Sequence, residues 1–594
     1  LIHSDNFQAI QLLQRRYHEQ IKCIYIDPPY NTSEETFVYK NNYRHSSWMS
    51  MIDSRITSSK NFLSIDGALL VTIDDEELYH LKEVASSIFP ETGYIGTIVI
   101  QSNPRGRGIN SYYATSHEYC LVYGANPDLV EIVDQPLTQE QIQSYGHGEG
   151  EESYRLLPFR RSGGLSTPDL RPNSEFPLYY SLSLKKIVAV GAKRLREYPA
   201  PYESQLAYII GVDNQLVEVS IEELLKTNDI VTIMPTDSNG QRRVWRWSDR
   251  QKILLAAAVG DFIVKNNQGD YNIQLKDWIK GGRKPKTIWI DSKYDSSSHG
   301  TNLLINILGR RGQFGYPKSV YSTQDAIHTI LGNSETEVCL DYFAGSGTTG
   351  HAIINLNRTD GGTRKYILVE MGNYFETVTK PRIQKVIYSK DWKDGKPVSR
   401  EGSSHCFKYL RLESYEDALN NLTLRRTQEQ QLALEANPEF KENYLLSYML
   451  DVESQGSLLN IQSFVHPFNY QLNIATGAVS ESKSTNIDLV ETFNYLIGLR
   501  VQTLQNIRGF RVVTGLTPAG DRTLIIWRDL EENNNAALEE FFRKQDYNPR
   551  DMEFDLIYVN GDNNLENLRR PDETWKVRLI EEDFLRLMFD SEGL

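Results

Sequence analysis

A short apolar run ends in Asp-Pro-Pro-Tyr at residues 27–30, and this motif sets the tightest limits on the fold. Residues 23–26 are apolar and predict a short buried strand. Neither proline has an N–H to donate, and each restricts the residue before it, so the strand cannot continue past Ile26. We therefore expect a stiff, extended loop at the carboxyl end of a strand, which is the edge of an open α/β sheet where ligands bind.

This loop offers the groups that a flat base with an exocyclic amine needs. Asp27 supplies a carboxylate, the backbone supplies free carbonyls, and Tyr30 supplies a ring for stacking. The alternative is a turn that ends the strand, in which Asp27 only caps the next element. Short motifs recur by chance, so this motif alone supports both interpretations equally.

A second strand runs into a glycine-rich turn at residues 338–350. Gly345 and Gly347 permit positive φ and a close approach of a ligand to the backbone. A helix is expected from about His351 to Asn357, and its N-terminus would offer N–H groups to a carboxylate or phosphate. Gly-x-Gly alone is weak, because a tight turn is the commoner explanation and the dinucleotide and P-loop patterns are both incomplete here.

Together the two motifs resemble those of the amino-methyltransferases of DNA. In that family the Phe-x-Gly-x-Gly loop holds S-adenosylmethionine and the Asp-Pro-Pro-Tyr loop holds the target base. Here the base loop comes first and the glycine loop follows roughly 310 residues later. This order resembles the β group, in which the target-recognition region lies between the two loops.

Other segments resemble the modification subunits of type III restriction systems and their close relatives: residues 1–6, 27–32, 45–48, 117–119, 159–163 and 245–247. The resemblance covers residues 1–420 well and the remainder loosely. It implies an α/β fold, with a Rossmann-like S-adenosylmethionine-dependent methyltransferase core, an inserted target-recognition region and a C-terminal α+β module.

Four regions are expected along the chain: core first half 1–125, target-recognition insertion 126–295, core second half 296–420 and C-terminal docking or dimerisation module 421–594. In both core halves, near-continuous apolar strands alternate with helices, which predicts a mostly parallel sheet covered on both faces. The first half should hold strands at 1–3, 23–26, 67–73, 96–100 and 118–123 and helices at 7–17, 47–63 and 76–89. Residues 422–436 look helical, and 407–412 read as a strand of the same sheet.

The resemblance also implies roles for individual residues. In the base loop, Asp27 and the Pro28 carbonyl would accept the two amine hydrogens, Pro29 would stiffen the loop, and Tyr30 would stack on a flipped-out base. An Asp at the first position favours adenine, because the cytosine-N4 members usually carry Ser there. The residues expected to bind the cofactor are Asp5, Asp341, Phe343, Gly345, Gly347, Thr348 and Glu370.

Two of these cofactor residues also have a simpler explanation. Glu370 ends a predicted strand about 25 residues after the glycine turn, where an acid can accept ribose hydroxyls, although a solvated loop acid is the alternative. Asp5 is explained equally well as a helix cap.

Three kinds of basic segment supply the candidates for DNA contact. Arg105 and Arg107 lie among glycines in a flexible loop, and Arg283 and Lys284 lie in a basic segment, residues 281–320, with a local net charge of +5. The others alternate with or lie near aromatic residues: Arg160, Arg161, Arg243, Trp245 and Arg246. The cations suit phosphate contacts and the rings suit base stacking. A surface loop around Arg105 and an ordinary sheet with cation–π pairs elsewhere are the alternatives.

Composition sets the remaining bounds. A net charge of −14 argues against a chain that coats DNA non-specifically, but local charge still permits DNA binding. Three of the four cysteines lie in apolar runs and should be buried thiols, and no Cys/His cluster has zinc spacing, so no metal is expected. The sequence has no signal peptide or membrane-length apolar run, which fits a prokaryotic cytoplasmic enzyme. Leu1 already lies in the first strand pattern, so a preceding segment is expected.

Three functions fit these patterns. The leading one is an adenine-N6 DNA methyltransferase that modifies self DNA for a restriction or phage-defence system, with double-stranded DNA, a second copy of itself and an ATP-dependent restriction subunit as partners. The second is a DNA-binding specificity subunit that guides a partner nuclease or translocase, against which the intact Asp27, Gly345 and Gly347 argue. The third, an RNA or protein methyltransferase, is disfavoured by the large insertion. Nothing in residues 400–594 suggests catalysis. Residues 541–594 carry 13 acids and 8 bases, and this acidic balance favours protein docking over DNA binding.

Overall fold

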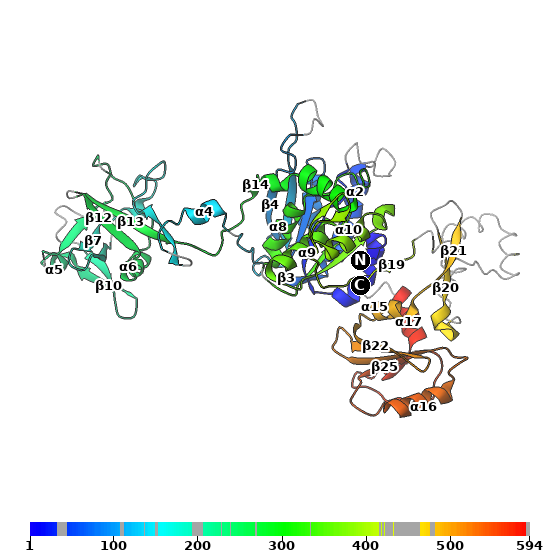
Figure 1. The fold of residues 1–594 in the computed structure, drawn as a ribbon. Coiled ribbons are helices and arrows are strands. Elements are labelled where there is room, and N and C mark those ends of the chain that lie inside the picture. Colours follow the sequence, from blue (N-terminus) through cyan, green and yellow to red (C-terminus); the bar gives the residue numbers. More distant parts are fainter. Residues whose placement is uncertain are drawn as a thin grey trace. The chain divides into compact units, whose positions relative to one another are not determined.

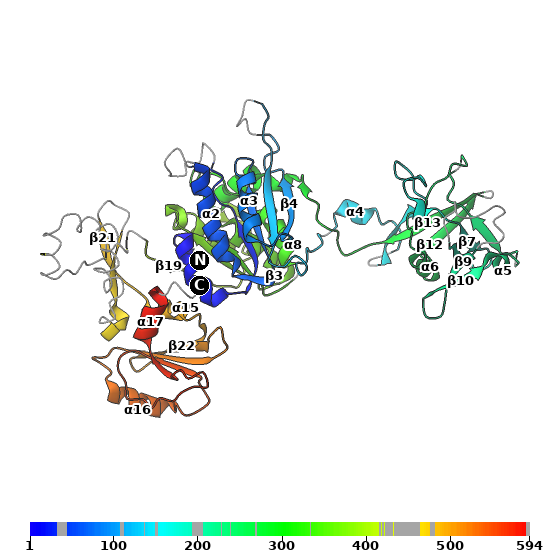
Figure 2. The ribbon, with the colours of Figure 1, turned by 180° about the vertical axis from the view of Figure 1, so that it is seen from behind.

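The computed structural model contains two compact units, Leu1–Val133 with Pro285–Leu594, and Asp134–Lys284. The structure describes residues 1–31, 44–106, 112–135, 137–148, 152–192, 206–226, 228–237, 239–267, 270–332, 334–414, 464–475 and 481–589, together with Asp417, Asn421 and Leu432. The elements of each unit are labelled in Figure 1 and appear from behind in Figure 2.

The first unit is built on a nine-stranded sheet in the order β14-β4-β5-β3-β2-β15-β16-β1-β19. Strand β5 runs antiparallel to both of its neighbours, and the other neighbouring pairs are parallel. The strands are β1 (Ile2–His3), β2 (Ile21–Ile26), β3 (Leu63–Ile73), β4 (Tyr94–Ile100), β5 (Glu118–Gly124), β14 (Ile288–Trp289), β15 (Val338–Asp341), β16 (Lys365–Glu370) and β19 (Leu410–Arg411). The predicted mostly parallel sheet is confirmed.

Helices cover both faces of this sheet. One apolar core joins Ile24 and Ile26 to α1 (Asn6–Tyr17), α2 (Arg44–Lys60) and α3 (Leu78–Ile88), while the other joins Cys23 and Tyr25 to α8 (Val320–Leu331) and α9 (Thr348–Asp360). Alternate residues of one strand thus face opposite layers. Helices α8 and α9 lie in front in Figure 1, whereas α2 and α3 lie in front in Figure 2. Smaller elements of the unit are α7 (Leu303–Leu308), α10 (Thr379–Tyr388), β17 (Trp392–Lys393) and β18 (Lys396–Pro397).

Two expected elements can be compared directly with the structure. The strand expected at 407–412 is present as β19, which pairs with β1 at the edge of the large sheet. The helix expected at 47–63 was wrong at its end, because α2 stops at Lys60 and Leu63 begins β3. Phe62 and Leu63 continue the apolar pattern of the helix, but they are buried beside Ile21, whose N–H donates to the Phe62 carbonyl.

Strands β2 and β15 are neighbours in the centre of the sheet, where Cys23 pairs with Cys339 and Ile24 with Leu340. After β2 the chain continues to β3 on one side of this central pair, and after β15 it continues to β16 on the other side. This change of direction is a topological switch point, where open α/β sheets form a crevice at the carboxyl ends of their strands. Both motif loops begin at that crevice.

The second unit, Asp134–Lys284, is an antiparallel structure with sheets in the orders β10-β9-β8-β7-β11 and β12-β13-β6. It lies within the predicted range 126–295, and residue 288 already belongs to the large sheet through β14. Gln135 and Arg283 exchange two backbone hydrogen bonds of 2.8 and 2.9 Å, so the two ends of the unit are paired. Its elements are α4 (Gln139–Gln143), β6 (Tyr154–Pro158), β7 (Leu178–Ser181), β8 (Lys186–Gly191), β9 (Leu206–Ile210), β10 (Leu216–Ser220), α5 (Ile221–Leu225), β11 (Ile230–Ile233), α6 (Arg250–Ala258), β12 (Phe262–Asn267) and β13 (Asp270–Trp278).

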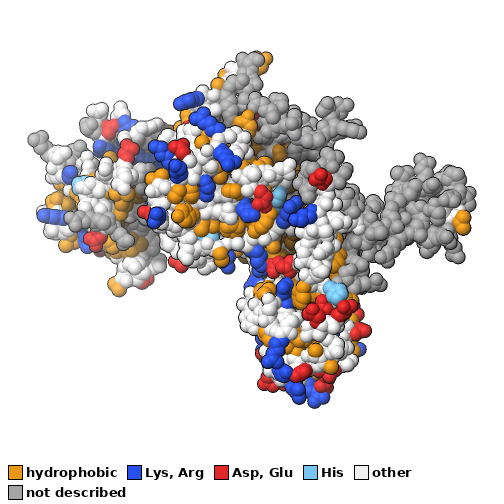
Figure 3. Space-filling view, turned by 45° about the vertical axis from the view of Figure 1, so that its right-hand side comes forward, with side chains coloured by type: hydrophobic (Ala, Val, Ile, Leu, Met, Phe, Trp, Pro, Cys, Tyr) orange, Lys and Arg blue, Asp and Glu red, His pale blue; other side chains and the backbone are white. Residues whose placement is uncertain are grey.

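The C-terminal part of the first unit is an α+β module with a five-stranded sheet in the order β22-β23-β24-β25-β26. Its elements are β20 (Gln471–Ala475), β21 (Ser482–Asn486), α15 (Leu489–Leu496), β22 (Arg500–Ile507), β23 (Phe510–Leu516), β24 (Arg522–Arg528), α16 (Asn535–Gln545), β25 (Leu556–Val559), β26 (Val577–Leu579) and α17 (Ile580–Phe589). Tyr495 of α15 packs against the apolar core of the large sheet that contains Ile24 and Ile26, and the Arg16 guanidinium lies 4.8 Å from the Tyr495 ring centroid. In Figure 3 acidic and basic side chains are interspersed over this module. The helix expected at 422–436 falls outside the described residues apart from Leu432.

Two further predictions concern burial. Cys23, Cys120 and Cys339 are buried free thiols, as expected, and Cys406 is exposed. Among the described helices, none combines the length and the apolar character that crossing a lipid bilayer requires.

Candidate active site

The two motif loops line one cavity of about 1040 Å³. The base loop (Asp27–Tyr30) follows β2, and the glycine loop (Phe343–Gly347) follows β15, so the pairing of these strands brings the loops together. Among the other lining residues are Asp5, Asn6, Arg55, Asp74, Glu118, Phe314, Lys318, Asp341, Thr348, Glu370 and Tyr374. Residues separated by more than 300 positions therefore share one site.

The Asp27 carboxylate is held by two side chains. Thr72 on β3 donates a hydrogen bond of 2.6 Å to Asp27 Oδ1, and Lys318 Nζ lies 3.2 Å from the same oxygen. Burial raises the pKa of Asp27, while the nearby Lys318 ammonium opposes this rise and Glu118 adds to it. The protonation of Asp27 therefore depends on its charged neighbours.

Lys318 and Glu118 complete a cluster that sequence reasoning missed. Lys318 Nζ lies 2.7 Å from Glu118 Oε2 and also donates to the Tyr30 hydroxyl, which in turn donates to Glu118 Oε2 at 3.0 Å. Burial alone would lower the pKa of Lys318, but Asp27 and Glu118 raise it. The sequence indicated only that Glu118 begins a strand and that Lys318 lies in a basic segment, and neither signal joins them to Tyr30.

Backbone and side-chain bonds hold the base loop in place. Trp48 of α2 donates a 2.7 Å hydrogen bond to the Pro29 carbonyl, and no described residue donates to the Pro28 carbonyl. Asn31, which follows the loop, has a left-handed φ of 57° and donates its side-chain amide to Glu77. The Pro29 carbonyl is therefore hydrogen-bonded, and the Pro28 carbonyl is available to a ligand.

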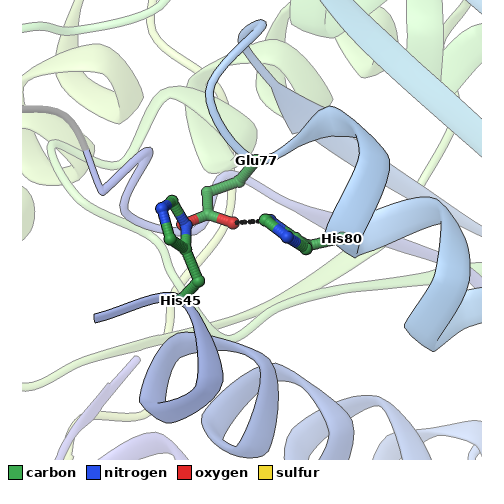
Figure 4. Close-up of side chains that lie close together, drawn as sticks. All are labelled: His45, Glu77 and His80. Atoms are coloured by element: carbon green, nitrogen blue, oxygen red, sulfur yellow. Dashed lines mark hydrogen bonds and ion pairs between the residues drawn. The ribbon is translucent and has the colours of Figure 1, made fainter. Parts of the chain in front are cut away.

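Glu77 is a buried carboxylate between two histidines, as Figure 4 shows. His45 Nδ1 lies 2.8 Å from one Glu77 oxygen, and His80 Nδ1 lies 2.7 Å from the other. These three residues have their candidate ligand atoms within 4.8 Å of one another, as a metal site would require. Hydrogen bonds from both histidines and from Asn31 nevertheless account for this buried carboxylate, so it is best described as a support for the base loop.

The glycine loop has the backbone conformation that its sequence predicted. Gly345 and Gly347 have φ values of 51° and 82°, and a Cβ on Gly345 would come within 3.1 Å of the Phe314 ring. Gly345 N–H and Gly372 N–H each donate a 2.8 Å hydrogen bond to the Glu370 carboxylate, one to each oxygen. Burial raises the pKa of Glu370, and these backbone donors oppose the rise. Glu370 thus braces the glycine loop while facing the cavity.

Asp341 ends β15 beneath the glycine loop. Its side chain accepts hydrogen bonds from the Phe343 N–H at 3.0 Å and from the Thr349 hydroxyl at 2.6 Å. The residue is only 2% exposed, and burial raises its pKa to about 7. It fixes the start of the loop from below.

A buried arginine that the sequence did not indicate supports the same loop. Arg382 of α10 donates hydrogen bonds to Ser346 Oγ at 2.8 Å and to Thr348 Oγ1 at 2.9 Å. Burial lowers its pKa to about 9. Because Ser346 and Thr348 accept from the guanidinium, their own hydroxyl hydrogens can point elsewhere.

Asp5 caps α1, accepting N–H bonds from Phe7 at 2.9 Å and Gln8 at 3.3 Å. It also lines the cavity, with Arg55 3.8 Å from its other oxygen. Its cap role is therefore observed, and its cofactor role stays a prediction.

The expected DNA-contact residues divide into engaged and exposed side chains. Trp245 is 2% exposed, donates to the Phe176 carbonyl at 2.7 Å and stacks on Phe159, so the expected surface stacking role is wrong for this ring. Its large apolar area is buried in the core of the second unit instead. Arg243 is bound to Asp237, Ser166 and Gln241 within the unit.

The remaining candidates are less constrained. Segments 159–161 and 244–246 lie side by side, with Arg161 N–H donating to the Val244 carbonyl and Arg246 N–H to the Phe159 carbonyl. Arg160 donates to the Thr236 carbonyl, and Arg246 Nε to the Pro158 carbonyl at 3.2 Å. Burial and repulsion from Arg171 and Arg246 lower the pKa of Arg161. Arg105 and Lys284 are exposed, Arg283 is partly buried, and Arg107 lies outside the described residues.

Comparison with known proteins places this geometry in context. The model of a family described as DNA methylase, covering N6 and N4 enzymes, matches residues 21–381. The type II methyltransferase M.KpnI of Klebsiella pneumoniae is 30% identical over 397 residues, covering 64% of this chain and 81% of that protein. The type III restriction-modification enzyme EcoPI Mod subunit of Escherichia phage P1 is 25% identical over 439 residues, covering 65% and 62%. The chain thus spans less than two thirds of the Mod subunit. The crystal structure of the M1.HpyAVI–SAM complex aligns with 64% of this chain and 100% of its own at 13% identity, with a TM-score of 0.27.

Proposed function

This chain belongs to the N6/N4 DNA methylase family, and from that premise we propose that it is a site-specific DNA methyltransferase acting on adenine N6. Its methyl donor is S-adenosylmethionine and its substrate is double-stranded DNA. The observation that carries the proposal is the single cavity lined by the base loop and the glycine loop. A base amine and a methyl donor can meet there.

The base loop supplies acceptors for the reacting amine. Adenine N6 is a poor nucleophile because its lone pair is delocalised into the ring. Asp27 and the Pro28 carbonyl accept the two amine hydrogens, which favours a pyramidal nitrogen with its lone pair directed at the methyl group. Trp48 engages the Pro29 carbonyl and leaves that of Pro28 available. Positioning and electrostatics then supply most of the rate enhancement.

Tyr30 stacks on the target base after the base has left the duplex, because the amine cannot be reached inside the helix. The Tyr30 hydroxyl is fixed by Glu118 and Lys318, so the ring is already oriented. The choice of adenine over cytosine rests on Asp27, which stands where cytosine-N4 members of the family usually carry Ser. The proton that the amine loses passes to the Asp27 carboxylate and then to solvent.

The residues of the glycine loop fit S-adenosylmethionine. Gly345 presents bare backbone to the cavity, since a Cβ there would approach the Phe314 ring to 3.1 Å. Glu370 would accept ribose hydroxyls, and Asp5 would contact the adenosine end. Asp341, Phe343, Gly347 and Thr348 shape the remaining wall. When bound, S-adenosylmethionine supplies an electrophilic methyl group on its sulfonium sulfur.

The biological setting that we propose is a restriction-modification system or related phage defence in a prokaryotic cytoplasm. The names of the similar proteins from Klebsiella pneumoniae and Escherichia phage P1 support this setting. In the type III systems that the sequence resembles, a modification subunit works as a dimer and recruits an ATP-dependent restriction subunit. The similarity to a Mod subunit keeps a second candidate, a specificity subunit that guides such a partner.

For DNA contact we propose the cations that are fully or partly exposed rather than the buried ring. The candidates are Arg105, in the half of the core that carries the base loop, then Arg160, Arg161 and Arg246 on the paired segments, and Arg283 with Lys284 at the end of the second unit. Arg243 is less suited because it is already bound to Asp237.

A product analysis tests the function. The gene is expressed in a host without adenine methylation, and genomic DNA is read by single-molecule sequencing for modified adenines. Mass spectrometry of the nucleosides distinguishes N6-methyladenine from N4-methylcytosine, and Asp27→Ala serves as the matched control. N4-methylcytosine would move the assignment to cytosine, and unmodified DNA despite cofactor binding would favour the specificity-subunit candidate.

A further inference from the structure

Asp27, Lys318 and Glu118 form a cluster of charged side chains that come from three separate elements. Lys318 precedes α8, Glu118 begins β5, and Asp27 follows β2. Only 12% of the Lys318 side chain and 7% of the Glu118 side chain are exposed. The cluster therefore lies on the inner wall of the cavity, where charge interactions are weakly screened by solvent.

The lysine has no donor left for a substrate. An ammonium group has three N–H donors, and here its acceptors are Asp27 Oδ1, Glu118 Oε2 and the Tyr30 hydroxyl. Lys318 can therefore act on a bound base only through the groups that it holds. Two of those groups, Asp27 and Tyr30, are the ends of the base loop.

The charge around Asp27 is unbalanced without this lysine. Among the described residues, Lys318 is the cation that contacts Asp27, whereas Glu118, Asp74 and Asp341 are acids on neighbouring elements. Tyr25 and Tyr30 also face it, and burial raises the pKa of both, so they stay neutral. A partly buried carboxylate that is surrounded by acids takes up a proton more readily. A protonated Asp27 would donate a hydrogen bond with that oxygen and could no longer accept the amine hydrogen.

We propose that Lys318 is a positioning residue for methyl transfer, whose ammonium keeps Asp27 ionised and aimed at the amine, while Glu118 anchors the ammonium. This inference rests on the proposed function, since it assigns Asp27 the reacting amine. It predicts opposite effects for the two partners. Loss of Lys318 raises the pKa of Asp27, whereas loss of the Glu118 charge lowers it.

The pH dependence of turnover tests whether the pKa of Asp27 moves in these two directions. The ionised form of Asp27 is the active one, so its pKa sets the acid limb of the kcat profile. In Lys318→Met the acid limb moves to higher pH, and kcat at a fixed pH on that limb falls about tenfold for every pH unit that the limb moves. In Glu118→Gln the limb moves to lower pH, and in Lys318→Arg it stays near the wild-type position. The KM for S-adenosylmethionine is expected to be unchanged in all three.

Lys293→Met is the matched control. Lys293 lies in the short helical turn Ser292–Tyr294, its Nζ is 2.6 Å from Asp325 of α8, and it does not line the cavity. Its removal deletes an ion pair without touching Asp27, so the acid limb stays where it is. An unmoved limb in Lys318→Met, or a shift to higher pH in Glu118→Gln, overturns the proposal.

A second measurement does not depend on activity. Thermal unfolding of Asp27→Asn, Lys318→Met and the double variant forms a mutant cycle in the full-length chain. Lys318→Met should lower Tm more in the wild-type background than in the Asp27→Asn background, where the charge has already been removed. Equal losses overturn the inference. A coupled cycle in a protein that methylates no DNA would instead retain the ion pair and reject the proposed function.

Discussion

At the scale of single residues, Asp27 is the side chain on which the proposed chemistry depends. In the proposed mechanism Asp27 accepts one hydrogen of the reacting amine, so Asp27→Ala should lower kcat by about 100-fold or more. Cofactor affinity should change little, since the glycine loop is intact. Turnover measured on unmethylated DNA, with calorimetry of S-adenosylmethionine binding on the same sample, checks both parts. Near wild-type turnover would remove Asp27 from this role.

Asp341 offers a test of burial at the same scale. Its pKa is raised to about 7, far above the usual value for an aspartate, so the folded state binds its proton more tightly than the unfolded chain does. Its contribution to stability is therefore present at low pH and is lost as pH rises towards 7. Relative to Asp341→Asn, the wild type should gain Tm as the buffer is changed from pH 8 to pH 5. A difference in Tm that is constant with pH would contradict this burial effect.

At the scale of elements, the turn between β15 and α9 must present backbone rather than side chains. Gly345→Val should abolish S-adenosylmethionine binding, because the residue has positive φ and the new side chain would meet the Phe314 ring. Gly361→Val is the control, since Gly361 also has positive φ but has nothing within 4 Å of an added Cβ. Calorimetry on both variants separates loss of the cofactor site from general backbone strain. Equal loss of affinity in both would show that strain alone is responsible.

The elements themselves follow from the sequence more reliably than their contacts. Apolar runs and prolines locate β2, and paired glycines locate the turn after β15, because these signals are local. The bond between Lys318 and Glu118 joins residues 200 positions apart, so no local pattern contains it. Trp245 illustrates the opposite case: its arginine neighbours suggest a DNA surface, but the apolar area of the ring is buried beside Phe159. Local sequence reports residue type, and only the tertiary fold decides which face of a segment is covered.

At the scale of the whole molecule, the C-terminal module is predicted to serve assembly rather than catalysis. A chain that ends after residue 425 retains β19, which pairs with β1 beside Asp5, whereas a cut near 400 would remove it. The shorter chain should bind S-adenosylmethionine and methylate DNA but lose its partner contacts. Its Tm should fall, because Tyr495 no longer covers the apolar core that contains Ile24 and Ile26.

Light scattering, with methylation assayed on the same sample, measures this separation. Full-length oligomeric state and undiminished partner binding in the truncated chain would disprove a docking role. A folded truncated chain that no longer binds duplex DNA would assign part of the recognition surface to this module.

The paired ends of the second unit have a consequence for how such a protein can change. Gln135 and Arg283 are bonded to each other, so the unit of about 150 residues begins and ends at one point. Segments whose two ends meet can be replaced by another of different length without moving the strands outside them. Under the target-recognition role predicted for this unit, recombination between related genes would exchange it as one cassette and give a lineage a new target sequence, with the large sheet inherited unaltered.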